Sequence, residues 1–163
     1  MSRAFVKEDG PDNAPLPDLP ISPYPNYVTP RGFAQLQARL AEAQTRLAGL
    51  RARMDRLDRL PEAAAERDIR YVEARLKSAL LMTSEGRGCE EVVFGHRVSV
   101  VDEGGAKTAY TIVGEDEADA ATGHIAPQSP LARALLGTQP GDVVAWRRPA
   151  GVVELEVLAI AWP

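Results

Sequence analysis

Three acidic residues, Glu62, Glu66 and Asp68, follow Pro61 in a stretch that is otherwise rich in alanine and arginine. Carboxylate oxygens are the ligands that a hard cation such as Mg²⁺ prefers. Glu62 and Glu66 are four residues apart and therefore share one face of a helix, whereas Asp68 is turned away from Glu66. Carboxylates also favour the first turns of a helix, where the helix dipole is positive. The pattern thus predicts either a catalytic acidic cluster, with Glu62 and Glu66 as metal ligands, or an ordinary helix start.

Arginines dominate the stretch that precedes these acids. Residues 30–60 hold seven arginines against three acidic residues, although the whole chain has a net charge of -4. A row of basic side chains on a helix attracts a phosphate backbone, but it can equally be a solvated helix face. We name three of these arginines the basic lane and treat it as a candidate RNA contact. The basic lane consists of Arg46, Arg53 and Arg56.

Two runs of apolar residues, spaced three and four apart, must position these charges. This spacing is typical of coiled-coil helices, and Pro61 separates the two runs. The first run is Phe33, Leu36, Leu40, Ala43, Leu47, Leu50, Met54 and Leu57, and the second is Ala65, Ile69, Val72, Leu76 and Ala79. We expect a first helix that reaches Leu60, roughly 45 Å long, a sharp turn at Pro61 and an antiparallel second helix that ends near Thr83. The acids would then lie at the tip of a coiled-coil hairpin, which could instead serve as a spacer or a dimerisation element.

The segments on either side of this hairpin define three regions. Residues 1–28 contain six prolines with acidic residues between them, which excludes helix and central strand and predicts an extended, largely disordered arm. Thr29 and Pro30 are typical of the first residues of a helix. A glycine-rich hinge at residues 84–88 ends the hairpin. The expected regions are therefore an arm (1–28), a coiled coil (29–84) and a second domain (85–163).

The second domain has the pattern of an α+β fold. Short β-prone segments alternate with turns, and Ser129-Pro130 begins a short helix that closes at Gly137. We expect strands at 92–94, 97–101, 108–113, 124–126, 143–146 and 152–161, with a solvated acidic loop at 115–119. The result would be an antiparallel sheet packed on one helix.

Composition excludes several classes of protein. No apolar run approaches the roughly 18 residues of a membrane span, and the first residues do not resemble a secretion signal, so we expect a cytoplasmic protein without membrane contact. Cys89 is the only cysteine and cannot form an internal disulfide. His96 and His124 lack the neighbouring ligands of a metal site.

Several motifs resemble the GreA/GreB family of bacterial transcript cleavage factors. Val28-Thr29-Pro30-Arg31-Gly32-Phe33 is similar to the family's opening V-T-x-x-G-(Y/F). Phe94-Gly95-His96-Arg97-Val98 and Tyr110-Thr111-Ile112-Val113-Gly114 resemble its F-G-x-x-V and (Y/F)-x-I-V-G. The most specific match is the run from Ser129 to Gly137, S-P-L-A-R-A-L-L-G, followed by Pro140-Gly141-Asp142. The resemblance covers nearly all of residues 27–163.

The resemblance implies an FKBP-like second domain and an accessory factor rather than an enzyme. Such a factor binds RNA polymerase through the loop Gln128, Ser129 and Pro130, inserts its coiled coil into the secondary channel and contacts nascent RNA there. It has no cofactor of its own. The polymerase supplies Mg²⁺, which acids at the tip help to hold while the polymerase hydrolyses backtracked RNA. We expect a monomer.

The tip departs from the family's D-x-x-E. Counting forward from Thr29 aligns Glu66 with the family's Glu and Ala63 with its Asp, whereas counting back from Arg75 aligns Glu62 with the Asp. Three functions remain open. The first is assistance of cleavage through Glu62 and Glu66, aided by Asp68. The second is occupation of the channel as a regulator without cleavage. The third is a role as a coiled-coil interaction module outside transcription.

Overall fold

The computed structural model describes residues 14–55 and 58–163. Helices and an antiparallel-rich sheet make up the fold, as the sequence predicts in outline. The described chain forms two compact units. One contains the residues up to Pro23 together with Leu36–Lys77, and the other contains Tyr24–Gln35 together with Ser78–Pro163. Each unit is described by itself.

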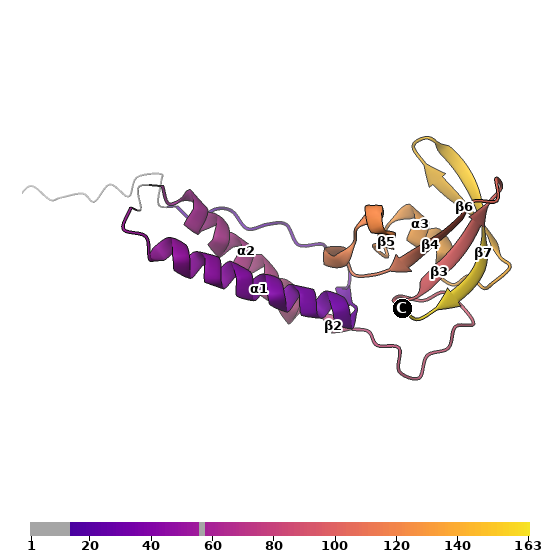
Figure 1. Cartoon of the computed structure of the whole chain (residues 1–163), viewed down its shortest axis with the longest axis horizontal. Helices are drawn as coiled ribbons and strands as arrows, with labels where there is room; N and C mark the ends of the chain where they lie inside the picture. Colours follow the sequence, from indigo (N-terminus) through magenta and orange to yellow (C-terminus); the bar gives the residue numbers. More distant parts are fainter. Residues whose placement is uncertain (1–13, 56–57) are drawn as a thin grey trace, which may run out of the picture. The chain divides into compact units, whose positions relative to one another are not determined.

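Two antiparallel helices form most of the first unit. They are α1 (Pro30–Arg51), whose first residues belong to the second unit, and α2 (Leu60–Lys77). Figure 1 shows them side by side. Their buried apolar residues fall on the predicted seams, with spacings of seven and four that place them on one face of each helix. These residues are Leu36, Ala43 and Leu47 on α1, and Ala65 and Val72 on α2.

The connection between the helices differs from the prediction. Helix α1 ends at Arg51 instead of reaching Leu60, and Pro61 lies in the first turn of α2 instead of at the bend. A proline costs little there, because the first backbone N–H groups of a helix have no intrahelical partner. Met54 lies beyond the end of α1, and it is fully exposed and outside the seam. Leu57, the last predicted seam residue, lies outside the described residues.

Helix α2 also ends earlier than predicted, at Lys77 rather than near Thr83. The residues that follow form β2 (Leu80–Leu81), which pairs in parallel with β1 (Tyr27–Val28). The backbone N–H of Leu80 donates to the carbonyl of Asn26 at 2.8 Å. Two-residue strands leave no periodic pattern in a sequence, which is why the motif analysis did not find this pair.

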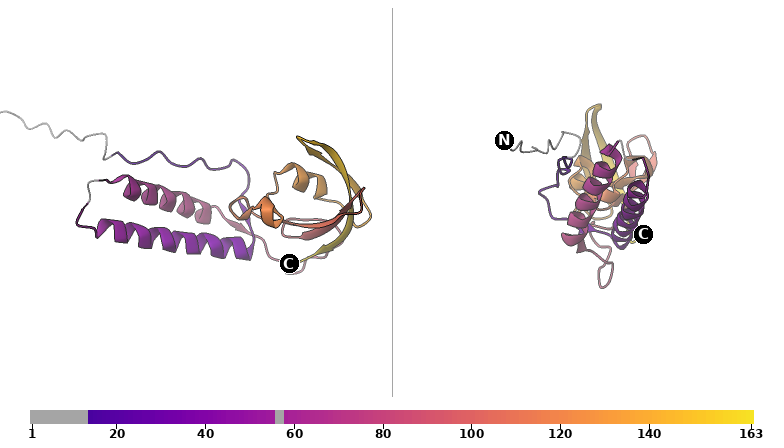
Figure 2. Two further views of the ribbon diagram at one scale, coloured as in Figure 1. Left: turned by 45° about the horizontal axis from the view of Figure 1, so that its top comes forward. Right: turned by 90° about the vertical axis from the view of Figure 1, so that its left-hand side faces the viewer.

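Residues of the proline-rich arm contact α2 inside the first unit. The guanidinium of Arg70 donates from Nε to Oδ1 of Asp18 at 2.6 Å, and from Nη2 to the carbonyl of Leu16 at 2.9 Å. Figure 2 shows this part of the arm running beside the helices. The contact therefore fixes one acidic residue of the arm against a basic residue of α2.

Five strands of the second unit form one sheet in the order β5-β4-β3-β7-β6. All neighbours are antiparallel except β4 and β5, which are parallel. The bounds are β3 (Arg97–Asp102), β4 (Lys107–Ile112), β5 (His124–Ile125), β6 (Val143–Arg148) and β7 (Gly151–Ala161), with short 3₁₀ helices η2 (Glu115–Glu117) and η3 (Ala120–Thr122). The strand expected at 92–94 does not form. Val92 instead exchanges backbone hydrogen bonds with Gly137 and Thr138, at 2.8 Å each, after the short helix.

Helix α3 (Pro130–Leu135) lies against the concave face of this curled sheet (Figure 2). Its residues Leu131, Ala132 and Leu135 are buried. They join one apolar core with side chains from the sheet and from the segment before it. The other core residues are Val92, Phe94, Val98, Val100, Ile112, Ile125, Leu155 and Val157. This core fixes the position of the loop that precedes α3.

A buried histidine makes the stability of the second unit depend on pH. His96 is fully buried, its Nδ1 accepts from the Val93 N–H at 3.0 Å, and its ring lies 4.2 Å from that of Trp162. Burial lowers the pKa of His96, and nearby Arg87 lowers it further. The unfolded chain therefore binds a proton at a higher pH than the folded chain does.

We expect the free energy of unfolding to be highest above about pH 6.5, the ordinary pKa of histidine, and to fall as the pH drops below it. Urea unfolding followed at several pH values between about 5 and 8 measures this slope. The variant His96→Phe should lose most of the pH dependence, whatever its absolute stability. An identical slope in this variant would assign the effect to another group.

Candidate functional site

Each acidic residue predicted for the tip faces an arginine. Glu66 Oε1 accepts from Arg51 Nη2 at 2.7 Å. Glu62 lies in the first turn of α2, 5% exposed, with Oε2 3.8 Å from Nη2 of Arg59. The carboxylates are thus close to positive charges that the chain itself supplies.

Asp68, two residues after Glu66 on α2, is also paired with an arginine. Its Oδ2 accepts from Arg46 Nη2 at 2.8 Å, so both this pair and the Arg51–Glu66 pair join α1 to α2. Within residues 14–55 and 58–163, no three His, Cys, Asp or Glu side chains are grouped so that they could hold a metal ion. A cation would have to be held largely by other ligands, and Glu66 or Asp68 would have to leave its arginine to join them.

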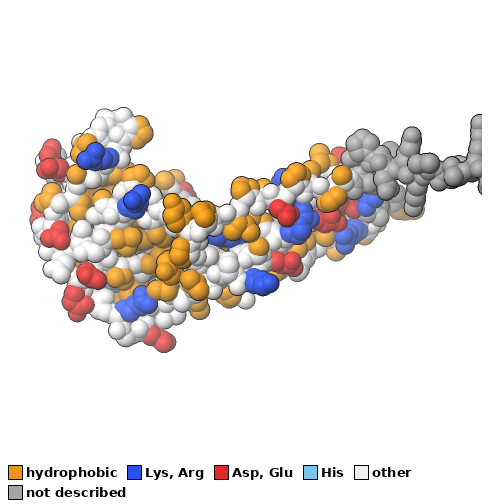
Figure 3. All heavy atoms as spheres, turned by 180° about the vertical axis from the view of Figure 1, so that it is seen from behind, with side chains coloured by type: hydrophobic (Ala, Val, Ile, Leu, Met, Phe, Trp, Pro, Cys, Tyr) orange, Lys and Arg blue, Asp and Glu red, His pale blue; other side chains and the backbone are white. Residues whose placement is uncertain are grey.

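The basic lane is not continuous in the part of the chain that the structure describes. Arg46 is engaged by Asp68, and Arg53 lies beyond the end of α1. Arg56 lies outside the described residues. Figure 3 shows acidic and basic side chains interspersed over the helix pair on the face drawn there. Mixed charges of this kind are typical of a solvated helix surface.

The loop Gln128-Ser129-Pro130 is held rigidly by the start of α3. Ser129 is the N-cap, since its Oγ accepts from the Ala132 N–H at 3.2 Å, and Pro130 is the first helical residue, as predicted. The Ser129 N–H also donates to the carbonyl of Ala126 at 3.0 Å. Pro130 is exposed at the surface. The loop therefore presents a fixed backbone shape to solvent.

Gln128 has one unusual property in this loop. Its Oε1 atom is buried and accepts no hydrogen bond from any described residue. A buried acceptor without a donor costs about 1–3 kcal/mol. The Gln128 amide oxygen therefore lowers the stability of this loop and is not presented to solvent.

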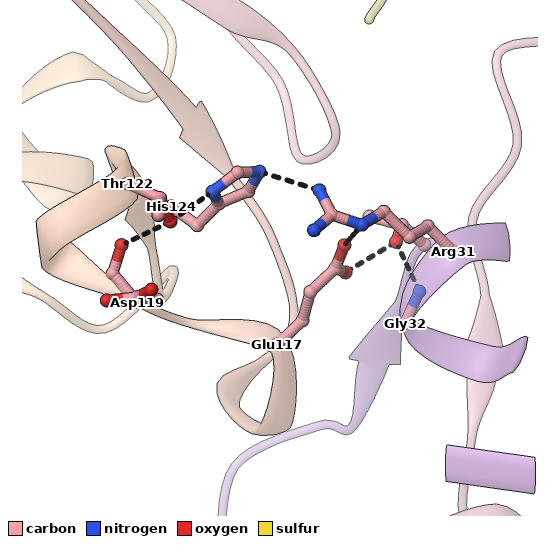
Figure 4. Close-up of polar contacts among 7 residues, drawn as sticks. Arg31, Gly32, Glu117, Asp119, Thr122 and His124 are labelled. Atoms are coloured by element: carbon pink, nitrogen blue, oxygen red, sulfur yellow. Dashed lines mark hydrogen bonds and ion pairs between the residues drawn. The ribbon is translucent and has the colours of Figure 1, made fainter. Parts of the chain in front are cut away.

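A polar network that the sequence analysis missed joins the first turn of α1 to η2 and β5 within the second unit (Figure 4). Thr29 Oγ1 accepts from the Gly32 N–H at 2.9 Å, which confirms Thr29 as N-cap, and donates to Glu117 Oε2 at 2.5 Å. Glu117 Oε1 lies 3.7 Å from Arg31 Nε. The carboxylate of Glu117 is only 4% exposed, so the expectation of a solvated 115–119 loop is wrong at this residue.

His124 extends this network. Arg31 Nη1 lies 3.0 Å from His124 Nε2, and Thr122 Oγ1 lies 2.8 Å from His124 Nδ1. A guanidinium only donates, so Nε2 accepts and Nδ1–H donates to Thr122. Thr122 in turn donates to the carbonyl of Asp119 at 3.1 Å. These side chains pair with one another by hydrogen bonds and an ion pair, and several of them line a cavity of about 290 Å³. Because their polar atoms are already paired, the network indicates a structural role.

Two glycines of the motifs described above, Gly32 and Gly114, lie in this region at positions where neighbouring atoms come close to the backbone. A Cβ on Gly114 would lie 2.6 Å from the backbone oxygen of Tyr27, and one on Gly32 would lie 2.5 Å from Glu117 Oε2. At Gly114 the obstructing atom belongs to the backbone and there is no room for a side chain, whereas at Gly32 the Glu117 side chain would have to shift. The glycines therefore permit β1 and α1 to approach the segment around Glu117, and their presence in both motifs was the available sequence signal.

Comparison with known proteins agrees with these motifs. The family model described as "Transcription elongation factor, GreA/GreB, C-term" matches residues 87–161. A transcription elongation factor GreA of Nitratidesulfovibrio vulgaris is 37% identical over 106 residues, which cover 61% of this chain and 65% of the relative. The matched segment thus spans less than two thirds of that relative's length.

Two further relatives complete the comparison. The GreA of Nitratidesulfovibrio vulgaris Miyazaki F is 35% identical over 108 residues, covering 62% of this chain and 68% of the relative. The crystal structure of GreA factor homolog 1 (Gfh1) of Thermus thermophilus has a TM-score of 0.40 and 26% identity, covering 85% of this chain and 99% of that one. On the sequence matches, this chain belongs to the GreA/GreB family of transcription elongation factors.

Proposed function

We propose that this chain binds RNA polymerase through Gln128, Ser129 and Pro130 and acts on the elongation complex through its helix pair. The family membership and the rigid, exposed loop before α3 support this docking mode. In this proposal α1 and α2 form the family's coiled-coil hairpin, which enters the secondary channel and meets nascent RNA, and the sheet domain is FKBP-like. The chain is an accessory factor, a monomer that works in the cytoplasm. Among the described residues, no helix is both long and apolar enough to cross a bilayer.

Two modes of action follow from this docking. In the first, Glu62 and Glu66, aided by Asp68, share the Mg²⁺ that the polymerase supplies and assist its hydrolysis of backtracked RNA. In the second, the helix pair occupies the channel and regulates transcription without assisting cleavage. The contacts of the acids decide which mode the geometry favours.

The ion pairs of the acids favour the second mode. Glu66 and Asp68 are held by Arg51 and Arg46 at 2.7 and 2.8 Å, and Glu62 is buried. A carboxylate must leave its arginine before it can bind a metal, and a ligand displaced by about 1 Å can reduce a rate on the order of 10²-fold. We therefore conclude that the chain is a polymerase-binding elongation regulator whose cleavage activity is weak. The single observation that carries this conclusion is the Arg51–Glu66 pair.

The test separates binding from cleavage. Affinity for RNA polymerase is measured first, and shortening of RNA in backtracked complexes second, for the full chain and for Glu66→Ala. Glu73→Ala, an exposed acidic residue further along α2, is the matched control. We expect tight binding, altered elongation and slow cleavage that is the same in both variants.

Other results would correct the proposal in defined ways. Fast cleavage that drops about tenfold or more in Glu66→Ala, but not in Glu73→Ala, would establish the first mode. Absence of polymerase binding, together with a concentration-dependent dimer in sedimentation, would overturn both modes in favour of a coiled-coil interaction module.

A further inference from the structure

We infer that α2 carries a binding surface for an extended, proline-rich polypeptide segment, and that residues 14–23 of this chain occupy it as a releasable strap. We use the name strap for these ten residues. They belong to the first unit together with α2, and Figure 2 shows them running beside the helices. This surface is independent of the proposed polymerase docking, because both the strap and α2 are parts of the free chain.

Helix α2 is covered on more sides than α1 is. Within residues 34–50, α1 buries or half-buries a single stripe, and its other residues are exposed. Within residues 62–76, every residue of α2 except Glu73 is buried or half-buried. A helix that packs against one partner helix buries one stripe, so α2 has cover on a second side. The strap supplies part of that cover, since it contacts α2 at Arg70.

Burial along the strap repeats every three residues. Leu16, Leu19 and Ser22 are half-buried, and the other residues of the strap are exposed. Its four prolines restrict the backbone and are incompatible with a helix interior. Proline-rich chains favour the polyproline II conformation, which has three residues per turn, so that residues three apart share a face. The strap therefore buries one face, which carries two leucines, and leaves its other faces in solvent.

Arg70 binds the strap at two points. Its Nε donates to Asp18 Oδ1 at 2.6 Å, and its Nη2 donates to the Leu16 carbonyl at 2.9 Å. One guanidinium thus holds a carboxylate and the backbone carbonyl two residues before it, which fixes the register of the strap on α2. The segment that α2 recognises is therefore extended, with apolar residues three apart and an acidic residue between them.

The contact between the strap and α2 is weak enough to open. The side chains of Arg70 and Asp18 are 38% and 76% exposed, so water and salt compete with their ion pair. Segments held by few buried contacts open without unfolding the rest of a protein. A tethered segment has the advantage of a high effective concentration. A segment of the same chemistry from another protein would therefore reach α2 only by displacing the strap.

Nuclear magnetic resonance of the full chain tests whether Asp18 and Arg70 hold the strap. In the unchanged chain, the heteronuclear NOE of the non-proline strap residues should be that of an ordered backbone. Asp18→Arg and Arg70→Asp should each lower these values to those of a flexible coil and raise amide exchange in α2 around Arg70 about fivefold. The double variant, which exchanges the two charges, should restore both readouts. Glu42→Arg makes the same charge change on an exposed residue of α1 and should alter neither.

A second pair of variants tests the buried face of the strap. Leu19→Asp should release the strap, whereas Ile21→Asp adds the same charge at a side chain that is 49% exposed and should leave it bound. A synthetic peptide of residues 14–23, at about millimolar concentration, should then shift the α2 resonances of Leu19→Asp. It should not shift them when Arg70→Asp is added to that variant. A peptide of scrambled sequence is the control.

Several results would overturn this assignment. The first is a flexible strap in the unchanged chain. The second is a charge exchange between Asp18 and Arg70 that fails to restore order, and the third is an equal effect of Leu19→Asp and Ile21→Asp. The fourth is absence of peptide binding to the released α2 of Leu19→Asp. None of these measurements involves RNA polymerase, so a failure of the proposed function would leave their outcomes unchanged.

Discussion

Replacing Ala63 with aspartate is expected to raise RNA cleavage in backtracked RNA polymerase complexes by about tenfold or more. When the tip is aligned with the GreA/GreB family by counting forward from Thr29, Ala63 stands at the family's Asp and Glu66 at its Glu. The new aspartate therefore restores the family's D-x-x-E spacing. Residues three apart on a helix lie on neighbouring positions of one face, so both carboxylates can reach one cation once Glu66 has left Arg51. Ala63 is partly exposed in the first turns of α2, where a negative charge is also favoured by the helix dipole. The gain should therefore come without loss of stability.

The matched control for this experiment is Ala64→Asp. It adds the same charge one residue later, on a different face of α2, and should leave cleavage unchanged. Cleavage is measured as the rate of RNA shortening at saturating factor, so that differences in polymerase affinity do not enter. Equal gains in both variants would mean that charge alone, and not the D-x-x-E geometry, limits cleavage. No gain in Ala63→Asp would indicate that Arg51 keeps Glu66 from the metal.

The second large effect is expected in the core beneath the docking loop. Leu135→Ala should lower the free energy of unfolding by about 2–5 kcal/mol, because Leu135 is completely buried and its truncation leaves a cavity. Leu135 anchors α3, and α3 begins at the loop of Ser129 and Pro130. We therefore also expect weaker polymerase binding near the temperature at which the variant unfolds.

Leu136→Ala provides the comparison, since the neighbouring leucine has the same chemistry but is 37% exposed. Its loss should cost less than about 1 kcal/mol. Urea unfolding followed by circular dichroism measures both variants. Similar losses in the two variants would contradict the assignment of Leu135 to the core and Leu136 to the surface.

Local signals in the sequence predicted much of the fold correctly. Thr29-Pro30 and Ser129-Pro130 each begin a helix with a capping hydroxyl and a proline at the first position, as the residue types require. The β3–β4 hairpin forms around its Asp-Glu-Gly-Gly turn, with Gly105 in the left-handed region. These features depend on neighbours within a few residues, and a sequence records such neighbours directly.

The outcome for the candidate site is different, because its residues come from distant parts of the chain. The sequence indicated which acids follow Pro61, but not that Glu66 and Asp68 meet Arg51 and Arg46 across the helix pair. Glu117 stands in an acidic run that is typical of a solvated loop, and only its contact with Thr29, 88 residues away, explains its burial.

What the sequence by itself determined is the order of the three helices and of the five strands of the main sheet, the starts of α1 and α3, and the family, since these follow from residue types at short spacing. Only the tertiary structure decided where α1 ends, which charges are paired, and that Asp18 of the arm meets Arg70 of α2. Pairing across the fold depends on packing geometry, and a shift of one helical turn exchanges the partners of every side chain along α2. Local propensity carries no information about that shift.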